Sequence, residues 1–209
     1  MGGTFNPVHL GHLRAAEEVA ESLQLKQVIF MPAAKPPHKT AVGLVSFDHR
    51  WRMLELAVGG NPLFVLSDLE HRRPGKSYSV ETLTQLSSQY GGEEELYFVL
   101  GLDAFLELPT WKSYRELFKL CHFVVVARPG ISPESLDEML KTQVGDNYLF
   151  DPDIQGYVRP NQYVVYYREI TLLDISSSNI RNLLASSRSV RYLLPDKVEH
   201  YIRQHGLYR

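Results

Sequence analysis

The first group of residues that could do chemistry lies in the segment 2–12, which has the sequence GGTFNPVHLGH. Its glycines allow the backbone to approach a ligand closely, and the first N–H groups of a following helix offer donors with positive partial charge. His9 and His12 add ring donors, which we expect to be neutral because a helix start disfavours added positive charge. The pattern favours a phosphate site, although two such histidines also occur as a surface pair or as half of a metal site.

A second group lies near the other end of the chain, in the segment 175–181 with the sequence ISSSNIR. Serine is a good helix N-cap, so a structural role alone accounts for one of the three serines. Arg181 follows Ser177 by four residues and therefore lies one turn further along the same helix face. A guanidinium beside a helix start could hold an oligophosphate, and a purely structural role is the alternative.

The elements that must position these groups follow from short apolar runs that alternate with segments of helical spacing. The runs are almost continuously apolar, as strands covered on both faces need to be, so the sequence predicts a doubly wound parallel α/β sheet of about five or six strands. We expect strands near residues 28–31, 63–66, 96–100, 123–127 and 164–167. We expect helices near residues 13–23, 53–57, 80–86, 114–120, 133–144, 177–184 and 195–202.

The chain length predicts a single domain over residues 1–209, closed by a helical part at 177–209. Residues 145–161 are rich in Asp, Pro, Gly and Asn, which predicts a surface excursion. A doubly wound sheet normally opens with a strand that leads into the first glycine-rich turn. Here the turn begins at Gly2, so we expect a truncated first strand and hypothesise that translation begins upstream of Met1.

The composition is that of an ordinary globular protein, with 44% hydrophobic and 22% charged residues. A formal net charge of −2 gives no field that would attract a nucleic acid polymer. The single cysteine, Cys121, excludes an internal disulfide, and the sequence has neither an 18-residue apolar run nor a signal segment. We therefore expect a cytoplasmic protein with no nucleic acid polymer and no membrane as partner, and the sequence leaves a homo-oligomer open.

The two segments together resemble the nucleotidyltransferase superfamily that carries a histidine-x-glycine-histidine signature. Further motifs resemble bacterial nicotinate mononucleotide adenylyltransferase, and the resemblance covers essentially the whole chain apart from residues 140–162. These motifs are KPPHK at 35–39, SYSVETL at 77–83, GLD at 101–103, PTW at 109–111, RPG at 128–130 and YLLP at 192–195. The resemblance implies a Rossmann-like fold with helices on both faces of the sheet.

The resemblance also implies a role for residues on the ATP side. His9, His12 and Arg181 would be the catalytic residues, with both histidines on the ATP phosphates and Ser177 and Arg181 on the departing pyrophosphate. The remaining residues implied for ATP are Gly3, Thr4 and Phe5 in the same groove and Gly101 and Asp103 at the ribose. Without the resemblance, Asp103 could equally cap a helix.

On the acceptor side, the resemblance implies that Trp111 stacks on the pyridine ring while backbone N–H groups near Ser79 and Lys112 receive its carboxylate. The other residues implied for substrate binding are Lys39 and Arg50, in the phosphate surroundings, and Arg128. Without the resemblance, Trp111 would be a half-buried core residue. We expect no metal ligands from the protein, because Mg²⁺ carried with ATP keeps water ligands and needs few carboxylates.

The implied reaction is adenylyl transfer from ATP to nicotinate mononucleotide, which gives nicotinate adenine dinucleotide and pyrophosphate in NAD biosynthesis. The alternatives are a phosphopantetheine adenylyltransferase or a relative that prefers nicotinamide mononucleotide. A third alternative is a nucleotide-binding module without catalysis.

Overall fold

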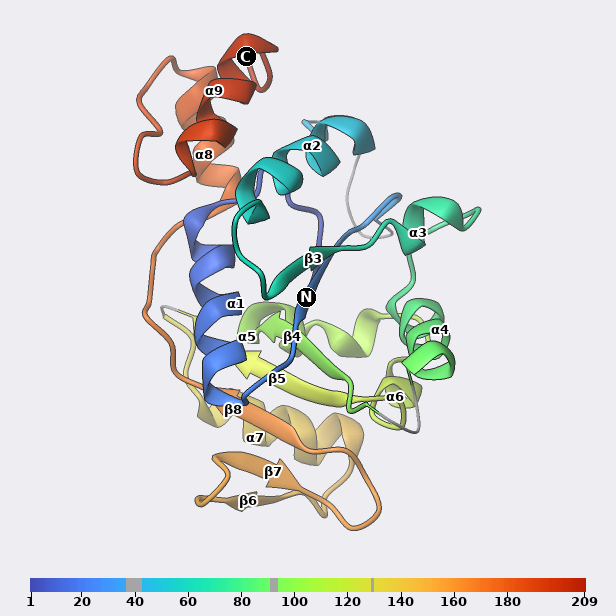
Figure 1. Cartoon of the computed structure of the whole chain (residues 1–209). Helices are drawn as coiled ribbons and strands as arrows, with labels where there is room; N and C mark the ends of the chain where they lie inside the picture. The colour runs from blue at the N-terminus through green and yellow to red at the C-terminus, as the bar shows by residue number, and fades with distance from the viewer. Residues whose placement is uncertain (37–42, 91–93, 129) are drawn as a thin grey trace. The chain divides into compact units, whose positions relative to one another are not determined.

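We describe residues 1–36, 43–90, 94–128 and 130–209 of a computed structural model (Figure 1). The chain forms two compact units, which are described separately below. Unit 1 contains residues 1–77 and 173–209, and unit 2 contains residues 78–172. Within the described residues, every helix is too short or too polar to cross a membrane.

Unit 1 is built on a parallel sheet in the order β1-β2-β3. Its strands are β1 (Gly2–Gly3), β2 (Val28–Pro32) and β3 (Phe64–Leu66), and its helices are α1 (Leu10–Ser22), α2 (Phe47–Val58), α3 (Leu69–Arg72), α8 (Ser177–Ala185) and α9 (Asp196–Gln204). The central strand β2 supplies Phe30, which is fully buried, because both faces of this strand are covered. The first strand is two residues long and pairs with the end of β2 through Gly2 and Met31.

Unit 2 contains a five-stranded sheet in the order β4-β5-β8-β7-β6. The strands are β4 (Tyr97–Gly101), β5 (His122–Val126), β6 (Leu149–Asp151), β7 (Gly156–Val158) and β8 (Val165–Arg168). The helices are α4 (Ser79–Tyr90), α5 (Leu102–Leu106), η1 (Leu108–Thr110), α6 (Tyr114–Leu117), α7 (Glu134–Met139) and the π-helix η2 (Leu140–Val144). Strands β4, β5 and β8 run parallel. Parallel strands that alternate with flanking helices confirm the predicted α/β fold class.

The segment that the sequence predicts as a surface excursion, residues 145–161, contains the antiparallel hairpin of β6 and β7 (Figure 1). The hairpin extends the sheet because β7 pairs antiparallel with β8. Two tyrosines anchor the segment in the core of unit 2, since Tyr148 is 1% exposed and Tyr157 is 8% exposed. These aromatic anchors are scattered among turn-forming residues, so the segment lacks the continuous apolar run by which the other strands are recognised.

The buried Tyr148 hydroxyl generates a prediction about stability. This hydroxyl has no hydrogen-bond partner among the described residues, and burial raises the pKa of Tyr148, so the group is a neutral, desolvated phenol. Because an unsatisfied buried polar group costs about 1–3 kcal/mol, Tyr148→Phe should raise the free energy of unfolding by about 1 kcal/mol, measured by urea denaturation.

Tyr114→Phe is the matched control for this prediction. The Tyr114 hydroxyl donates to the Gln143 carbonyl at 2.9 Å, so its loss should lower the free energy of unfolding by about 1 kcal/mol. Equal destabilisation by both substitutions would contradict the assignment of Tyr148 as an unsatisfied group.

Candidate active site

The two predicted catalytic histidines lie at the first turn of α1 in unit 1. His9 is the N-cap residue in extended backbone geometry, and its backbone N–H donates to Nδ1 of His12 at 3.2 Å. The two rings stack with centroids 3.6 Å apart, and His9 is 3% exposed. Because Nδ1 of His12 is an acceptor here, the neutral ring carries its proton on Nε2. His12 can therefore present a single ring donor to a ligand.

Two glycines of this segment are required by close approach to aromatic rings. A Cβ atom at Gly11 would lie 3.1 Å from Nδ1 of His9, and the stacked, buried His9 ring has little room to shift. A Cβ atom at Gly3 would lie 3.0 Å from the ring of Phe5, which is 2% exposed. The glycines thus let the rings of His9 and Phe5 pack directly against the backbone.

The second predicted segment packs against the turn that precedes α1. Ser176 is the N-cap of α8, because its Oγ accepts from the N–H of Asn179 at 3.1 Å. Ser177 is thereby available for another contact, and its Oγ donates to the carbonyl of Pro7 at 2.8 Å. Arg181 donates through Nη1 to the carbonyl of Asn6 at 2.9 Å. Unit 1 therefore brings together two motifs that lie 170 residues apart in sequence.

Asn6 holds the centre of this turn, although its sequence context predicts no role for it. Its side-chain Nδ2 donates to the carbonyl of Gly43 at 2.8 Å, while Oδ1 accepts from the N–H of Val45 at 3.3 Å and from the hydroxyl of Tyr208 at 2.9 Å. Burial raises the pKa of Tyr208, so this phenol is a neutral donor. An asparagine between Phe5 and a proline in the glycine-rich motif is the signal that could have drawn attention to it.

Arg50 lies beside the same turn but contacts backbone rather than open space. Its guanidinium donates to the carbonyls of Thr4 at 2.9 Å and Ala33 at 2.8 Å, and more weakly to those of Ala34 and Val45. The side chain is 1% exposed, and burial lowers its pKa. Since arginine has five N–H donors, four of which are used here, the structure favours a positioning role. The predicted direct contact with a phosphate stays a prediction.

In unit 2, the predicted ribose residues cluster at the end of β4. Arg128 donates through Nε to Oδ1 of Asp103 at 3.2 Å, and this ion pair lies directly over the Cα atom of Gly101. A Cβ atom at Gly101 would collide with the Asp103 carboxylate and would lie 2.6 Å from Nε of Arg128. Glycine at this position therefore permits the ion pair.

The predicted residues of the pyridine subsite also lie in unit 2. Trp111 is half-buried, its ring centroid is 6.3 Å from that of Phe98, and its backbone N–H donates to the carbonyl of Leu108 at 2.8 Å. Ser79 is the first residue of α4. The Lys112 side chain reaches α4, where its Nζ lies 2.7 Å from Oε1 of Glu81.

The sequence of this chain matches a known family and several named relatives. The cytidylyltransferase-like family matches residues 1–183. Proteins named "Probable nicotinate-nucleotide adenylyltransferase" from Geotalea uraniireducens and Syntrophotalea carbinolica are each 46% identical to this chain, and the alignments cover all of it and 96% and 95% of the relatives.

The chain belongs to the nicotinate-nucleotide adenylyltransferase family.

A solved structure shares the fold of this family member at low sequence identity. The nicotinic acid mononucleotide adenylyltransferase of Plasmodium falciparum, in complex with NaAD, superposes with a TM-score of 0.76. The match has 18% identity and covers 99% of this chain and 94% of that one. The same enzyme complexed with APC gives a TM-score of 0.73 at 17% identity.

For this family member, the predicted site residues divide between the two units. Those that unit 1 brings together around the turn before α1 are Gly3, Thr4, Phe5, His9, His12, Arg50, Ser177 and Arg181. Those in unit 2 are Ser79, Gly101, Asp103, Trp111, Lys112 and Arg128. Lys39 lies outside the described residues. Within the described part of the chain, no group of three His, Cys, Asp or Glu side chains is arranged to hold a metal ion.

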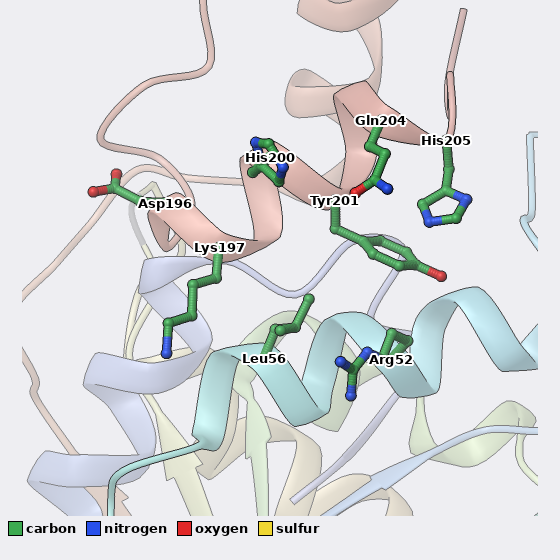
Figure 2. A pocket seen from close by; sticks show the side chains of 8 residues that line it. All are labelled: Arg52, Leu56, Asp196, Lys197, His200, Tyr201, Gln204 and His205. Atoms are coloured by element: carbon green, nitrogen blue, oxygen red, sulfur yellow. The ribbon is translucent and has the colours of Figure 1, made fainter.

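Unit 1 of this family member also has a groove between α2 and α9, with a volume of about 600 Å³ (Figure 2). Figure 2 shows Arg52 and Leu56 on α2 facing side chains of α9. The other lining residues are Asp196, Lys197, His200, Tyr201, Gln204 and His205. None of the predicted site residues that the structure describes lines this groove, so it is distinct from the turn before α1.

The buried guanidinium of Arg50 leads to a prediction about the stability of the protein. Arg50→Met should lower the free energy of unfolding by about 2–4 kcal/mol in urea denaturation, because it leaves several buried carbonyls without donors. Arg52→Met is the control on the same helix. The Arg52 side chain is 55% exposed and pairs with Glu55, so this substitution should change stability by no more than about 0.5 kcal/mol. Similar losses in both variants would overturn the positioning role of Arg50.

Proposed function

We propose that the protein transfers the adenylyl group of ATP to the phosphate of nicotinate mononucleotide, forming nicotinate adenine dinucleotide and pyrophosphate. The observation that carries the proposal is the assembly of His9 and His12 with Ser177 and Arg181 around one turn, in a chain 46% identical over its full length to nicotinate-nucleotide adenylyltransferases. The full-length similarity supports the acceptor, and the turn supports the phosphate chemistry.

The reaction needs no nucleophile from the protein. A phosphate monoester is already anionic at neutral pH, so one of its oxygens attacks the α-phosphorus while the bond to the bridging oxygen of pyrophosphate breaks. The protein has to align two polyanions and stabilise the negative charge that develops on the leaving group. Donors such as Nε2 of His12 and the guanidinium of Arg181 suit this task.

Each unit would serve one part of the reaction. Donors at the start of α1 and on α8 would hold the triphosphate, with Mg²⁺ entering as part of the ATP substrate and neutralising its charge. In unit 2, Asp103 would accept from ribose hydroxyls, and Trp111 would stack on the pyridine ring. Lys39 and Arg128 would add positive charge near the substrates.

The test of this function is pyrophosphate release with ATP and Mg²⁺ and three alternative acceptors. We expect nicotinate mononucleotide to give a clearly higher kcat/KM than nicotinamide mononucleotide or phosphopantetheine. A preference for either of the other acceptors would assign a different adenylyltransferase activity. ATP binding without pyrophosphate release from any acceptor would indicate a binding module and would overturn the proposal.

His12→Ala tests the role of the ring donor. Because the donor should act most strongly as charge moves to the leaving pyrophosphate, kcat should fall by about 100-fold or more while the KM for ATP changes little. His200→Ala, at an exposed position on α9, should leave both constants unchanged. A folded His12→Ala protein with wild-type kcat would refute the role.

A further inference from the structure

Lys112 is held against the first turn of α4 by two contacts of different kinds. Its Nζ lies 2.7 Å from Oε1 of Glu81 and 4.4 Å from the ring centroid of Tyr78. Tyr78 directly precedes α4, and Glu81 lies in its first turn. An ion pair and a cation–π contact therefore converge on a single ammonium group.

The backbone turns at Lys112, so the two contacts of its side chain connect this turn to α4. Trp111 ends the short helix η1, where its N–H donates to the carbonyl of Leu108 at 2.8 Å. Ser113, on the other side of Lys112, has a φ of +51°, which is a left-handed conformation that non-glycine residues rarely adopt. The Lys112 backbone thus lies between a capped helix end and a strained residue, and its side chain connects it to α4.

This connection places two sets of backbone donors in one part of unit 2. The first N–H groups of α4, at Ser79 and Val80, precede the positions that intrahelical hydrogen bonds can satisfy. The N–H of Lys112 belongs to the segment that the side chain of Lys112 ties to the same helix turn. A carboxylate offers only acceptors to such donors, whereas a carboxamide offers one acceptor and an NH₂ group that repels them.

We infer that Tyr78, Glu81 and Lys112 form a clamp that fixes the spacing of the α4 and Lys112 backbone donors and thereby sets the preference for an acidic over an amidated pyridine nucleotide. This inference rests on the proposed function and deepens it. The three side chains are positioning residues, because they act through the backbone and not by touching the substrate. A loosened clamp would let the donors adapt to an amide and would weaken their hold on the acid.

The test compares Glu81→Gln, Lys112→Met and the double variant, using pyrophosphate release with nicotinate and nicotinamide mononucleotides. Each single variant should lower the kcat/KM ratio of acid to amide by about threefold, mainly through a higher KM for the acid, because the Lys112–Glu81 pair is partly exposed and such pairs contribute little. The double variant should be no worse than either single variant, because both remove the same clamp.

A second explanation of the same contacts predicts a different pattern. If the Lys112 ammonium attracts the substrate carboxylate directly, Glu81→Gln should lower the KM for the acid, because the competing carboxylate is gone. That result would overturn the clamp. Glu116→Gln and Lys119→Met remove an exposed ion pair of 2.9 Å between α6 and the residues that follow it, and they should leave the acid-to-amide ratio unchanged.

The outcomes separate the clamp from the function on which it rests. A wild-type protein without preference for the acid would refute the proposed function itself. A wild-type preference that survives in both single variants, with unfolding midpoints equal to wild type, would refute only the clamp. A lower ratio accompanied by a lower unfolding midpoint would indicate general loosening of unit 2 and would also count against it.

Discussion

The turn between β1 and α1 depends on side chains that bind its backbone carbonyls. Arg50 donates to Thr4, Arg181 to Asn6 and Ser177 to Pro7. A carbonyl oxygen carries negative partial charge, and an unpaired one beside a polyanion would be both unsatisfied and repulsive. By pairing these oxygens with hydroxyl and guanidinium donors, the protein satisfies the carbonyls of the turn that precedes α1.

The same interaction explains why distant parts of the sequence are needed for one site. Arg50 comes from α2, Ser177 and Arg181 from α8, and Tyr208 from the end of the chain, where it donates to Asn6. Each contact satisfies a buried polar group of the turn, so removing one partner leaves an uncompensated group rather than a small loss of contact area. Several elements thus hold the turn in one conformation, and under the proposed function such a preorganised array of donors would need little reorganisation in the transition state.

Much of this arrangement could be predicted from the sequence, because the relevant signals are local. The apolar runs at β2, β4 and β5 and the GGTFNPVHLGH motif are recognisable within a few residues. The hairpin of β6 and β7 was not predicted, since its buried Tyr148 and Tyr157 are separated by turn residues. The carbonyl contacts of Arg50 and the links of Asn6 were also missed, because they join residues from 5 to 202 positions apart and have no sequence pattern.

Under the proposed function, the two units would face different physical problems. The turn before α1 in unit 1 would have to stabilise several negative charges, a task for which guanidinium groups and a helix start supply strong attraction. In the proposed acceptor subsite of unit 2, the acid and the amide would differ in one group of nearly equal size, which is charged and only accepts hydrogen bonds in the acid. Fixed backbone donors suit discrimination between the two because they reward an acceptor and penalise an N–H at the same point. Such donors discriminate only while their spacing is held, and the contacts of Lys112 with Tyr78 and Glu81 hold one side of it.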